Sequence, residues 1–429
     1  MFLSLILSAQ LSFATPNNLD VIRPEKTSTT HQMGGLRWSP TNFKGQGRAL
    51  GYRAQEFAMT PDLKERVDFW IDIYSKYTSS YGIIHDRTNL NIVYAVIDFS
   101  PIISNSSLTL SRVERAKTAA VKRKREEIYG RLSRLKSVRS SDSLDGEDLR
   151  IWNMFPAATR RRDLAVAANK EAIRFQLGQK DFFKKGIYYS GRYLRQMESI
   201  FRKEGLPIEL TRLPFVESSF NIYAQSKVGA SGIWQFMRGT GKSYLKINSQ
   251  VDERNDPLSA SRAAAKLLRS NYRVLRSWPL AITAYNHGPT GTKRLVQKYR
   301  TRRMSELIDR AEGGSFGFAS KNFYACFLAA LEVEANANKY FGPLEVAQEV
   351  AFETYVLSKQ ASYKLLLNVF GYDTRRAELL NPHFTAAVKR GRMLMPKGSK
   401  VRIPPSKSRQ FVSLLSPNSP KRNVTSYID

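Results

Sequence analysis

Apolar residues recur at helical spacing along most of the chain. In the segment 61–85, Val67, Trp70, Ile71 and Tyr74 lie three or four positions apart and would share one helical face. Similar spacing predicts further helices over 182–204, 257–275, 279–299 and 322–340, and the helix-forming composition of 108–138 predicts another there. The pattern therefore predicts a mainly α fold.

Two helix boundaries are marked by residues that suit them. Gly205 follows a helical face that contains Met197 and Phe201, and glycine readily adopts the left-handed conformation that ends a helix. Asp256 precedes Pro257, which suits an N-cap followed by the first residue of a long helix. Neither boundary requires a role in chemistry.

Breaks in the pattern divide the chain into six segments. A short apolar start and an irregular lead-in come first, and a helical extension and the largest helical domain follow. A small mixed α/β module and a flexible basic tail complete the chain. In order, the segments are 1–14, 15–60, 61–180, 181–345, 346–405 and 406–429.

The N-terminal segment resembles a secretory signal peptide. Residues 2–14 are mostly apolar but too few to span a bilayer, and Ser12 and Ala14 suit a signal peptidase site. No Lys or Arg precedes the apolar run, so the start of a cytosolic protein is the alternative. No cysteine follows the run, and no later stretch is long and apolar enough for a transmembrane helix. We expect export to the periplasm or cell envelope of a bacterium without a lipid anchor.

Charge and composition narrow the classes of partner and cofactor. The 429 residues carry a net charge of +31, which favours acidic polymers or surfaces as partners. The single cysteine, Cys326, excludes an intramolecular disulfide and a cysteine-built metal site. The four histidines, at 31, 85, 287 and 383, lack ligand spacing. We therefore expect neither a metal nor another cofactor.

One carboxylate stands out as candidate chemistry. Glu217 lies among Phe215, Val216 and Phe220, and apolar surroundings raise a carboxyl pKa toward the value that a general acid needs. The next acid along the chain is Asp252, whereas a glycosidase of the usual type needs two carboxylates. The segment between Glu217 and Asp252 therefore offers no second carboxylate for such a mechanism.

Three ordered blocks carry a resemblance to a known family. They are Glu217-Ser218-Ser219-Phe220-Asn221, Ser226 through Met237, and Ala284 through Pro289. This arrangement resembles the family 1 lytic transglycosylases, and most closely the membrane-bound lytic murein transglycosylase D-like branch. The resemblance implies that residues 181–345 form a lysozyme-like (α+β) catalytic domain.

The resemblance also implies an activity and a mechanism. Glu217 would protonate the β-1,4 glycosidic oxygen between N-acetylmuramic acid and N-acetylglucosamine in peptidoglycan. The substrate's acetamido group would stabilise the cationic centre, and the C6 hydroxyl would then attack C1 to give a 1,6-anhydro sugar. A hydrolytic muramidase on the same fold is one alternative. A catalytically silent peptidoglycan-binding protein is another.

The matched positions imply supporting roles for further residues, and each residue also has a purely structural role as an alternative. Tyr285 would hydrogen-bond Glu217, or serve the core, and Asn286 would line the same wall or fix the backbone. Ser226 would bind the acetamido group and Gln235 the sugar or Glu217, or both would stabilise their loop. The other candidates are Ser218 and Met237, which belong to the same blocks, and Trp234 and Tyr223, which would stack on sugars or pack in the core.

The remaining expectations concern partners. The C-terminal module resembles a degenerate LysM-like peptidoglycan-binding module, or is a plain subdomain of the catalytic domain. We expect a monomer that binds peptidoglycan glycan strands and the anionic cell-wall surface. The net charge alone would suit nucleic acid, but the sequence contains no recognition module for it.

Overall fold

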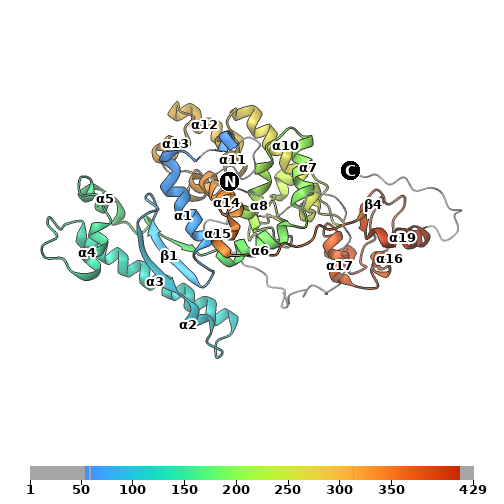
Figure 1. The fold of residues 1–429 in the computed structure, drawn as a ribbon, viewed down its shortest axis with the longest axis horizontal. Coiled ribbons are helices and arrows are strands. Elements are labelled where there is room, and N and C mark those ends of the chain that lie inside the picture. Colours follow the sequence, from blue (N-terminus) through green and yellow to red (C-terminus); the bar gives the residue numbers. More distant parts are fainter. Residues whose placement is uncertain (1–53, 58, 313, 416–429) are drawn as a thin grey trace. The chain divides into compact units, whose positions relative to one another are not determined.

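The structure is a computed structural model that describes residues 54–57, 59–312 and 314–415 and is mainly helical (Figure 1). This confirms the mainly α fold. The described residues form two compact units, and each unit combines segments that are separate in sequence. One contains 54–185 and 271–344, and the other contains 186–270 and 345–415, apart from the residues left undescribed.

The first unit, residues 54–185 and 271–344, combines helices with a three-stranded antiparallel sheet. Its first segment contains the short η2 (Ala54–Phe57) and η3 (Pro61–Leu63), then α1 (Lys64–Ser75), β1 (Tyr81–Asp86), β2 (Val93–Asp98), α2 (Ser100–Ile103), α3 (Leu110–Leu135), α4 (Gly146–Asn153), α5 (Arg160–Ala167), β3 (Ile173–Leu177) and the start of α6 (Lys180–Ser190). Its second segment contains the end of α10 (Pro257–Leu275), then α11 (Trp278–His287), α12 (Pro289–Tyr299), α13 (Met304–Arg310), α14 (Phe318–Ala335) and α15 (Ala337–Phe341).

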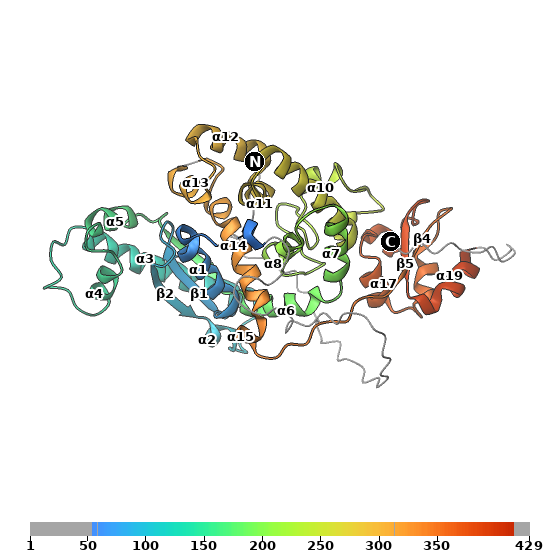
Figure 2. The same cartoon turned by 45° about the horizontal axis from the view of Figure 1, so that its top comes forward.

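The sheet has the order β2-β1-β3 and is covered on both faces (Figure 2). Ile84 of β1 pairs with Ala95 and Phe175, and this face packs in one hydrophobic cluster with Ile128 of α3. On the other face, the ring of His85 contacts Phe69 of α1 and Phe318 of α14. Because β1 is buried on both faces, its residues do not alternate between apolar and polar, and the helical pattern of 61–85 concealed the strand.

The predicted helical face in 61–85 is confirmed with one correction. Val67, Trp70 and Tyr74 are buried in α1, but Ile73 is buried where the prediction placed Ile71. Ile73 completes the core face because α1 packs along α14 as well as against the sheet, and this widens its buried stripe.

The second unit, residues 186–270 and 345–415, contains the candidate acid. Its first segment comprises the end of α6, then α7 (Leu194–Lys203), η4 (Ile208–Arg212), α8 (Leu213–Ser218), α9 (Arg238–Lys242), η5 (Glu253–Asn255) and most of α10. Its second segment comprises β4 (Glu353–Val356), α16 (Tyr363–Val369), α17 (Thr374–Leu380), α18 (Ala386–Lys389), β5 (Lys400–Ile403), η6 (Pro405–Lys407) and α19 (Ser408–Leu415). Gly205 follows α7 with a positive φ of 66°, as predicted.

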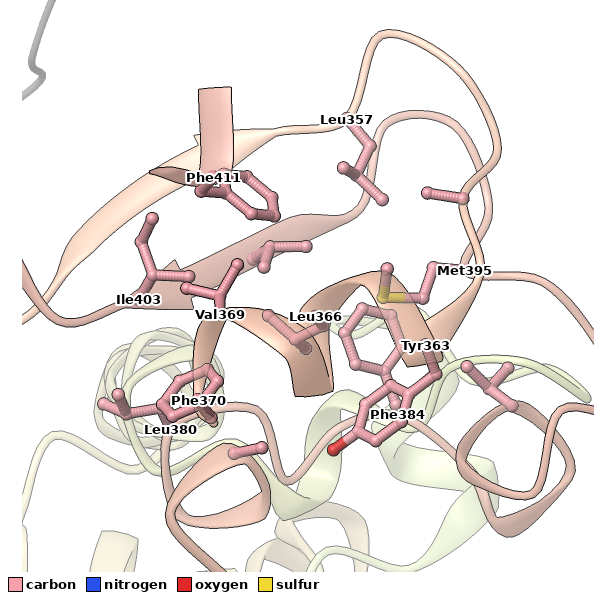
Figure 3. Close-up of a cluster of buried hydrophobic side chains, with 14 of the residues drawn as sticks. Leu357, Tyr363, Leu366, Val369, Phe370, Leu380, Phe384, Met395, Ile403 and Phe411 are labelled. Carbon is pink, nitrogen blue, oxygen red and sulfur yellow. The ribbon is translucent and has the colours of Figure 1, made fainter. Parts of the chain in front are cut away.

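The C-terminal segment of this unit has its own hydrophobic core. The antiparallel pair β4–β5 and helices α16 and α17 enclose Leu366, Val369 and Phe411 (Figure 3). Val251, from the loop before α10, belongs to the same cluster and forms a β-bridge with Phe384. The mixed α/β character of the module is as expected, but its core includes Val251 and Phe411 from outside the predicted 346–405 range. The predicted flexible tail is corrected at its start, because residues 408–415 form helix α19 and bury Phe411 in this core.

Two expectations concern the ends of the chain and membranes. The predicted signal peptide, most of the lead-in and the end of the basic tail lie outside the described residues. Among the helices that are described, none combines the length and the apolarity that crossing a bilayer requires.

Candidate active site

Glu217 lies near the end of the short helix α8, where its side chain is only 6% exposed. Phe215 and Val216 of the same helix are buried beside it in sequence. The helix ends abruptly because Ser219 and Phe220 both take left-handed conformations, with φ of 50° and 56°. Such conformations are costly for residues with a β-carbon, so packing must hold this turn.

The electrostatics of Glu217 follow from its burial. Loss of hydration disfavours the ionised form and raises the pKa of the Glu217 carboxyl to about 8. Among the described residues, no hydrogen bond or ion pair to this carboxyl opposes that effect. The carboxyl is therefore protonated at neutral pH and can donate a proton, as the apolar neighbours in the sequence predicted.

Ser218 fastens the acid-bearing helix to the loop that carries the second motif. Its Oγ donates a hydrogen bond to the carbonyl oxygen of Ile233 at 2.9 Å. The side chain is buried, so this bond forms away from water. Ser218 thus connects the end of the helix that carries Glu217 to the motif loop.

Ser226 and Gln235 both stabilise the loop 224–237 from within. Ser226 Oγ accepts a hydrogen bond from the backbone N–H of Ala230 at 2.9 Å. Gln235 Nε2 donates to the carbonyl oxygens of Ala224 and Gly232 at 3.1 and 2.8 Å. These bonds favour the loop-stabilising interpretation of both residues.

Arg254 is a loop-organising residue that the sequence reasoning missed. Its Nη1 donates to the carbonyl oxygens of Gly229 and Phe236 at 2.7 and 3.1 Å. Gly232 has a φ of 77° and lies so close to the Arg254 carbonyl that a β-carbon would collide with it. The charged run Asp252–Asp256 resembles a solvated surface loop, and only the fold shows that it supports the motif loop.

Trp234 is a core residue in this structure. Its side chain is 0% exposed, its Nε1 donates to Ser261 Oγ at 2.9 Å, and its ring stacks on Phe201. This favours the core interpretation over sugar stacking. Tyr223, by contrast, is 51% exposed and accessible, and Met237 is half-buried just before α9.

The carboxylates that follow Glu217 in sequence are committed to structural bonds. Asp252 pairs with Arg254 at 2.7 Å, and Glu253 accepts from the backbone N–H of Lys246 at 2.7 Å. Asp256 caps α10 by accepting from two backbone N–H groups and pairs with Arg402. Burial alone would raise the Asp256 pKa, but the charge of Arg402 holds that pKa well below its usual range. The predicted capping role of Asp256 is confirmed.

Tyr285 and Asn286 belong to α11 in the other unit. The Tyr285 ring stacks on Phe323 with centroids 6.4 Å apart. Asn286 is buried, and its Oδ1 accepts a hydrogen bond from Ser320 Oγ at 2.8 Å. Asn286 therefore joins α11 to α14 through a bond between side chains, which neither of its two predicted roles included. Within the described residues, no group of three or more His, Cys, Asp or Glu side chains is arranged to hold a metal ion.

Comparison with protein families gives a match over the central part of the chain. Residues 198–308 match the family described as "Transglycosylase SLT domain", and this range includes Glu217, Ser226, Gln235 and Tyr285. The match begins in α7 and ends in α13, so it includes all three sequence blocks.

Two curated relatives share part of the sequence. "Membrane-bound lytic murein transglycosylase D" of Escherichia coli (strain K12) is 31% identical over 157 residues, which are 34% of this chain and 32% of that protein. The "Putative tributyltin chloride resistance protein" of Alteromonas sp. (strain M-1) is 32% identical over 112 residues, 26% of this chain and 54% of the relative. The chain thus spans about a third of the length of the first relative and about half of the second.

Two solved structures are also similar. The lytic transglycosylase Slt of Pseudomonas aeruginosa, an inactive mutant, shares 16% identity with a TM-score of 0.31 over 59% of this chain and 39% of its own. The 70 kDa soluble lytic transglycosylase of Escherichia coli shares 15% identity with a TM-score of 0.30 over 67% of this chain and 53% of its own.

Proposed function

The chain carries a transglycosylase SLT domain at residues 198–308, and from this premise we propose that it is a lytic murein transglycosylase in which Glu217 is the catalytic acid. The substrate is the peptidoglycan glycan strand, cleaved at the β-1,4 bond after N-acetylmuramic acid. The observation that carries the proposal is the burial of Glu217, which raises its pKa to about 8 inside the matched domain.

The first chemical step needs a proton donor at neutral pH. A carboxyl with an ordinary pKa is almost fully ionised at pH 7, whereas Glu217 remains mostly protonated. It can therefore protonate the glycosidic oxygen as the bond from C1 breaks. This transfer leaves Glu217 ionised in an apolar site, where it is a stronger base than in water.

The second step uses that base. The acetamido group of the muramic residue stabilises the cationic centre at C1 while the leaving sugar departs. Glu217 then takes the proton from the C6 hydroxyl, which attacks C1 to close a 1,6-anhydro ring. The C6 hydroxyl belongs to the reacting sugar, so its attack is intramolecular and gains effective concentration. Glu217 ends the cycle protonated, and no water is consumed.

The neighbouring acids support a single-carboxylate mechanism. A hydrolase of the usual type needs a second carboxylate as base or nucleophile. Asp252 and Asp256 are paired with Arg254 and Arg402, and Glu253 accepts a backbone hydrogen bond. A carboxylate held in this way serves the structure, so we disfavour a hydrolytic muramidase.

The proposed cellular setting follows from the substrate. Peptidoglycan lies outside the cytoplasmic membrane, so we propose that the protein is exported and acts as a monomer in the periplasm or envelope. Its net charge of +31 would attract it to the anionic cell wall. Peptidoglycan itself carries lactyl and peptide carboxylates that supply such charge.

Replacement of the acid tests the proposal. We expect Glu217→Gln to reduce release of soluble muropeptides from purified sacculi at least a thousandfold, because the amide cannot donate the proton. Glu253→Gln is the matched control, since its carboxyl contacts only backbone of its own loop, and it should keep activity within a few-fold of wild type. Turnover by Glu217→Gln within tenfold of wild type would refute the assignment.

A further inference from the structure

Four cationic side chains in the sheet-containing unit lack an ion-pair partner. They are Arg66 of α1, Arg87 after β1, Arg174 of β3 and Lys321 of α14. Among the described residues, no carboxylate lies within ion-pair distance of any of the four, although ion pairs are frequent elsewhere in this unit. A group of cations left unpaired needs an explanation in terms of what else could neutralise it.

Hydrogen bonds bring three of the four elements together. Arg66 Nη2 donates to the carbonyl oxygen of Thr88 at 3.0 Å, next to Arg87 in the chain. Arg66 Nη1 donates to Asn322 Oδ1 at 3.0 Å, next to Lys321. Arg66 thus ties the segment after β1 to the start of α14. Lys321 lies next to Asn322 in α14, and its Nζ donates a hydrogen bond to the carbonyl oxygen of Ile308 at 2.5 Å.

Arg174 adds the fourth cation from the neighbouring strand. It lies opposite His85 in the β1–β3 ladder, two residues from Arg87. Its guanidinium stacks on the ring of Phe318 at 4.2 Å, three residues before Lys321 in α14. The Nε of Arg174 is buried and has no hydrogen-bond partner among the described residues.

The cations repel one another. Burial lowers the pKa of Lys321, and the charges of Arg66 and Arg87 lower it further. Burial likewise lowers the pKa of Arg174, and Arg87 adds to that effect. Asp309 attracts both Arg66 and Lys321, and Glu312 attracts Lys321, all from beyond ion-pair distance. Burial still lowers the pKa of Arg66, Arg174 and Lys321, so these three cations are held at a cost in hydration.

We propose that Arg66, Arg87, Arg174 and Lys321 form a binding site for an oxyanion, either a carboxylate or a phosphate group. Guanidinium groups present paired N–H donors that match the oxygens of both ligands, and lysine adds a point charge. Arg87 is exposed, so the group is open to solvent on its side. The site does not depend on the proposed glycan cleavage, because all four residues lie outside the three sequence blocks.

Thermal unfolding in matched salts tests this site. The melting temperature of the full chain is measured in sodium phosphate, sodium acetate and sodium chloride at equal pH and ionic strength. We expect phosphate, acetate or both to raise the wild-type Tm by about 2 °C or more over chloride, saturably with concentration. A rise in phosphate alone identifies a phosphate ligand, and a rise in acetate identifies a carboxylate.

Variants separate this site from general salt effects. Arg87→Gln and Lys321→Gln should lose at least half of the anion-dependent rise. In chloride, Arg87→Gln should melt at or above the wild-type Tm, since it relieves repulsion. Arg162→Gln, a side chain 75% exposed on α5, is the control and should keep the full rise. An equal rise in Tm for all variants would mean that the anions act by exclusion from the protein surface, and this would overturn the proposal. The absence of any rise in the wild-type Tm would overturn it as well.

Discussion

The carboxyl of Glu217 is neutral because it is buried, and the same burial opposes folding at neutral pH. Its folded pKa of about 8 exceeds its ordinary value of 4.5. Between these values the unfolded chain releases a proton that the folded chain retains. Folding therefore becomes less favourable as pH rises across this window. The burial that suits Glu217 to proton donation therefore also lowers the free energy of unfolding at neutral pH.

This linkage gives a prediction for stability against pH. Glu217→Gln cannot ionise, so its free energy of unfolding should increase relative to wild type as pH rises from about 5 to 8. The slope should be up to about 1.4 kcal/mol per pH unit. Urea denaturation of both proteins at several pH values measures it. A difference that does not change with pH would mean that the carboxyl is solvated and not raised in pKa.

Tyr285 is the second residue whose role can be tested separately from folding. The family resemblance implies that its hydroxyl orients the acid. We expect Tyr285→Phe to lower kcat by about tenfold to a hundredfold, because Glu217 is ionised once it has donated its proton and a hydrogen bond to a charged partner contributes about 1.5–3 kcal/mol. The Tm should change little, since the ring can still stack on Phe323. Unchanged activity per folded molecule would make Tyr285 a packing residue.

Among single residues, the candidate acid was easier to predict than the residues that stabilise the loop beside it. The apolar neighbours of Glu217 are adjacent in sequence, so its raised pKa could be predicted. The bonds of Ser226, Gln235 and Trp234 depend on how a loop folds on itself, and one sequence does not contain that information. Arg254 went unnoticed for the same reason, because the carbonyl oxygens it binds lie 18 and 25 residues away along the chain.

The helices and strands likewise divide into those that the sequence predicts and those that it does not. Long amphipathic helices such as α10 were predicted because their apolar residues recur on one face, which is the buried one. Strand β1 was not, since burial on both faces removes the alternation that identifies a strand. The left-handed turn after Glu217 was also missed, because Ser219 and Phe220 are not residues that favour positive φ.

The loop before α10 joins the motif loop to the C-terminal segment. On one side Arg254 binds the carbonyls of Gly229 and Phe236, and on the other Val251 bridges Phe384. Asp256 pairs with Arg402 of β5 in the same unit. We therefore favour a C-terminal subdomain that supports the catalytic domain over an independent LysM-like module.

The Asp256–Arg402 pair tests this connection. Arg402→Met would leave a buried carboxylate unpaired, which costs about 3–5 kcal/mol of stability. Adding Asp256→Asn removes that charge, and asparagine still caps a helix, so the double variant should recover most of the loss. The free energy of unfolding in urea measures both. A loss under 1 kcal/mol for Arg402→Met would show that the two segments are not coupled through this pair.

For the whole molecule, the excess of positive charge and the matched domain point to the same substrate. A net charge of +31 does not specify a fold, but it favours an anionic polymer, and peptidoglycan, the substrate that we propose for the matched domain, is such a polymer. The division into two units that interleave along the chain could not be predicted from the sequence. Breaks in hydrophobic pattern mark where segments end, and they do not show which segments pack together.

The chemical form of the product tests the central claim most directly. Purified sacculi are digested with the full chain, and the released muropeptides are weighed by mass spectrometry before and after borohydride reduction. The account predicts 1,6-anhydro-N-acetylmuramic acid ends, one water lighter than hydrolytic ends and resistant to reduction. Muropeptides that carry the full mass of water and accept hydride would contradict it, and a second, water-activating carboxylate would then have to be found.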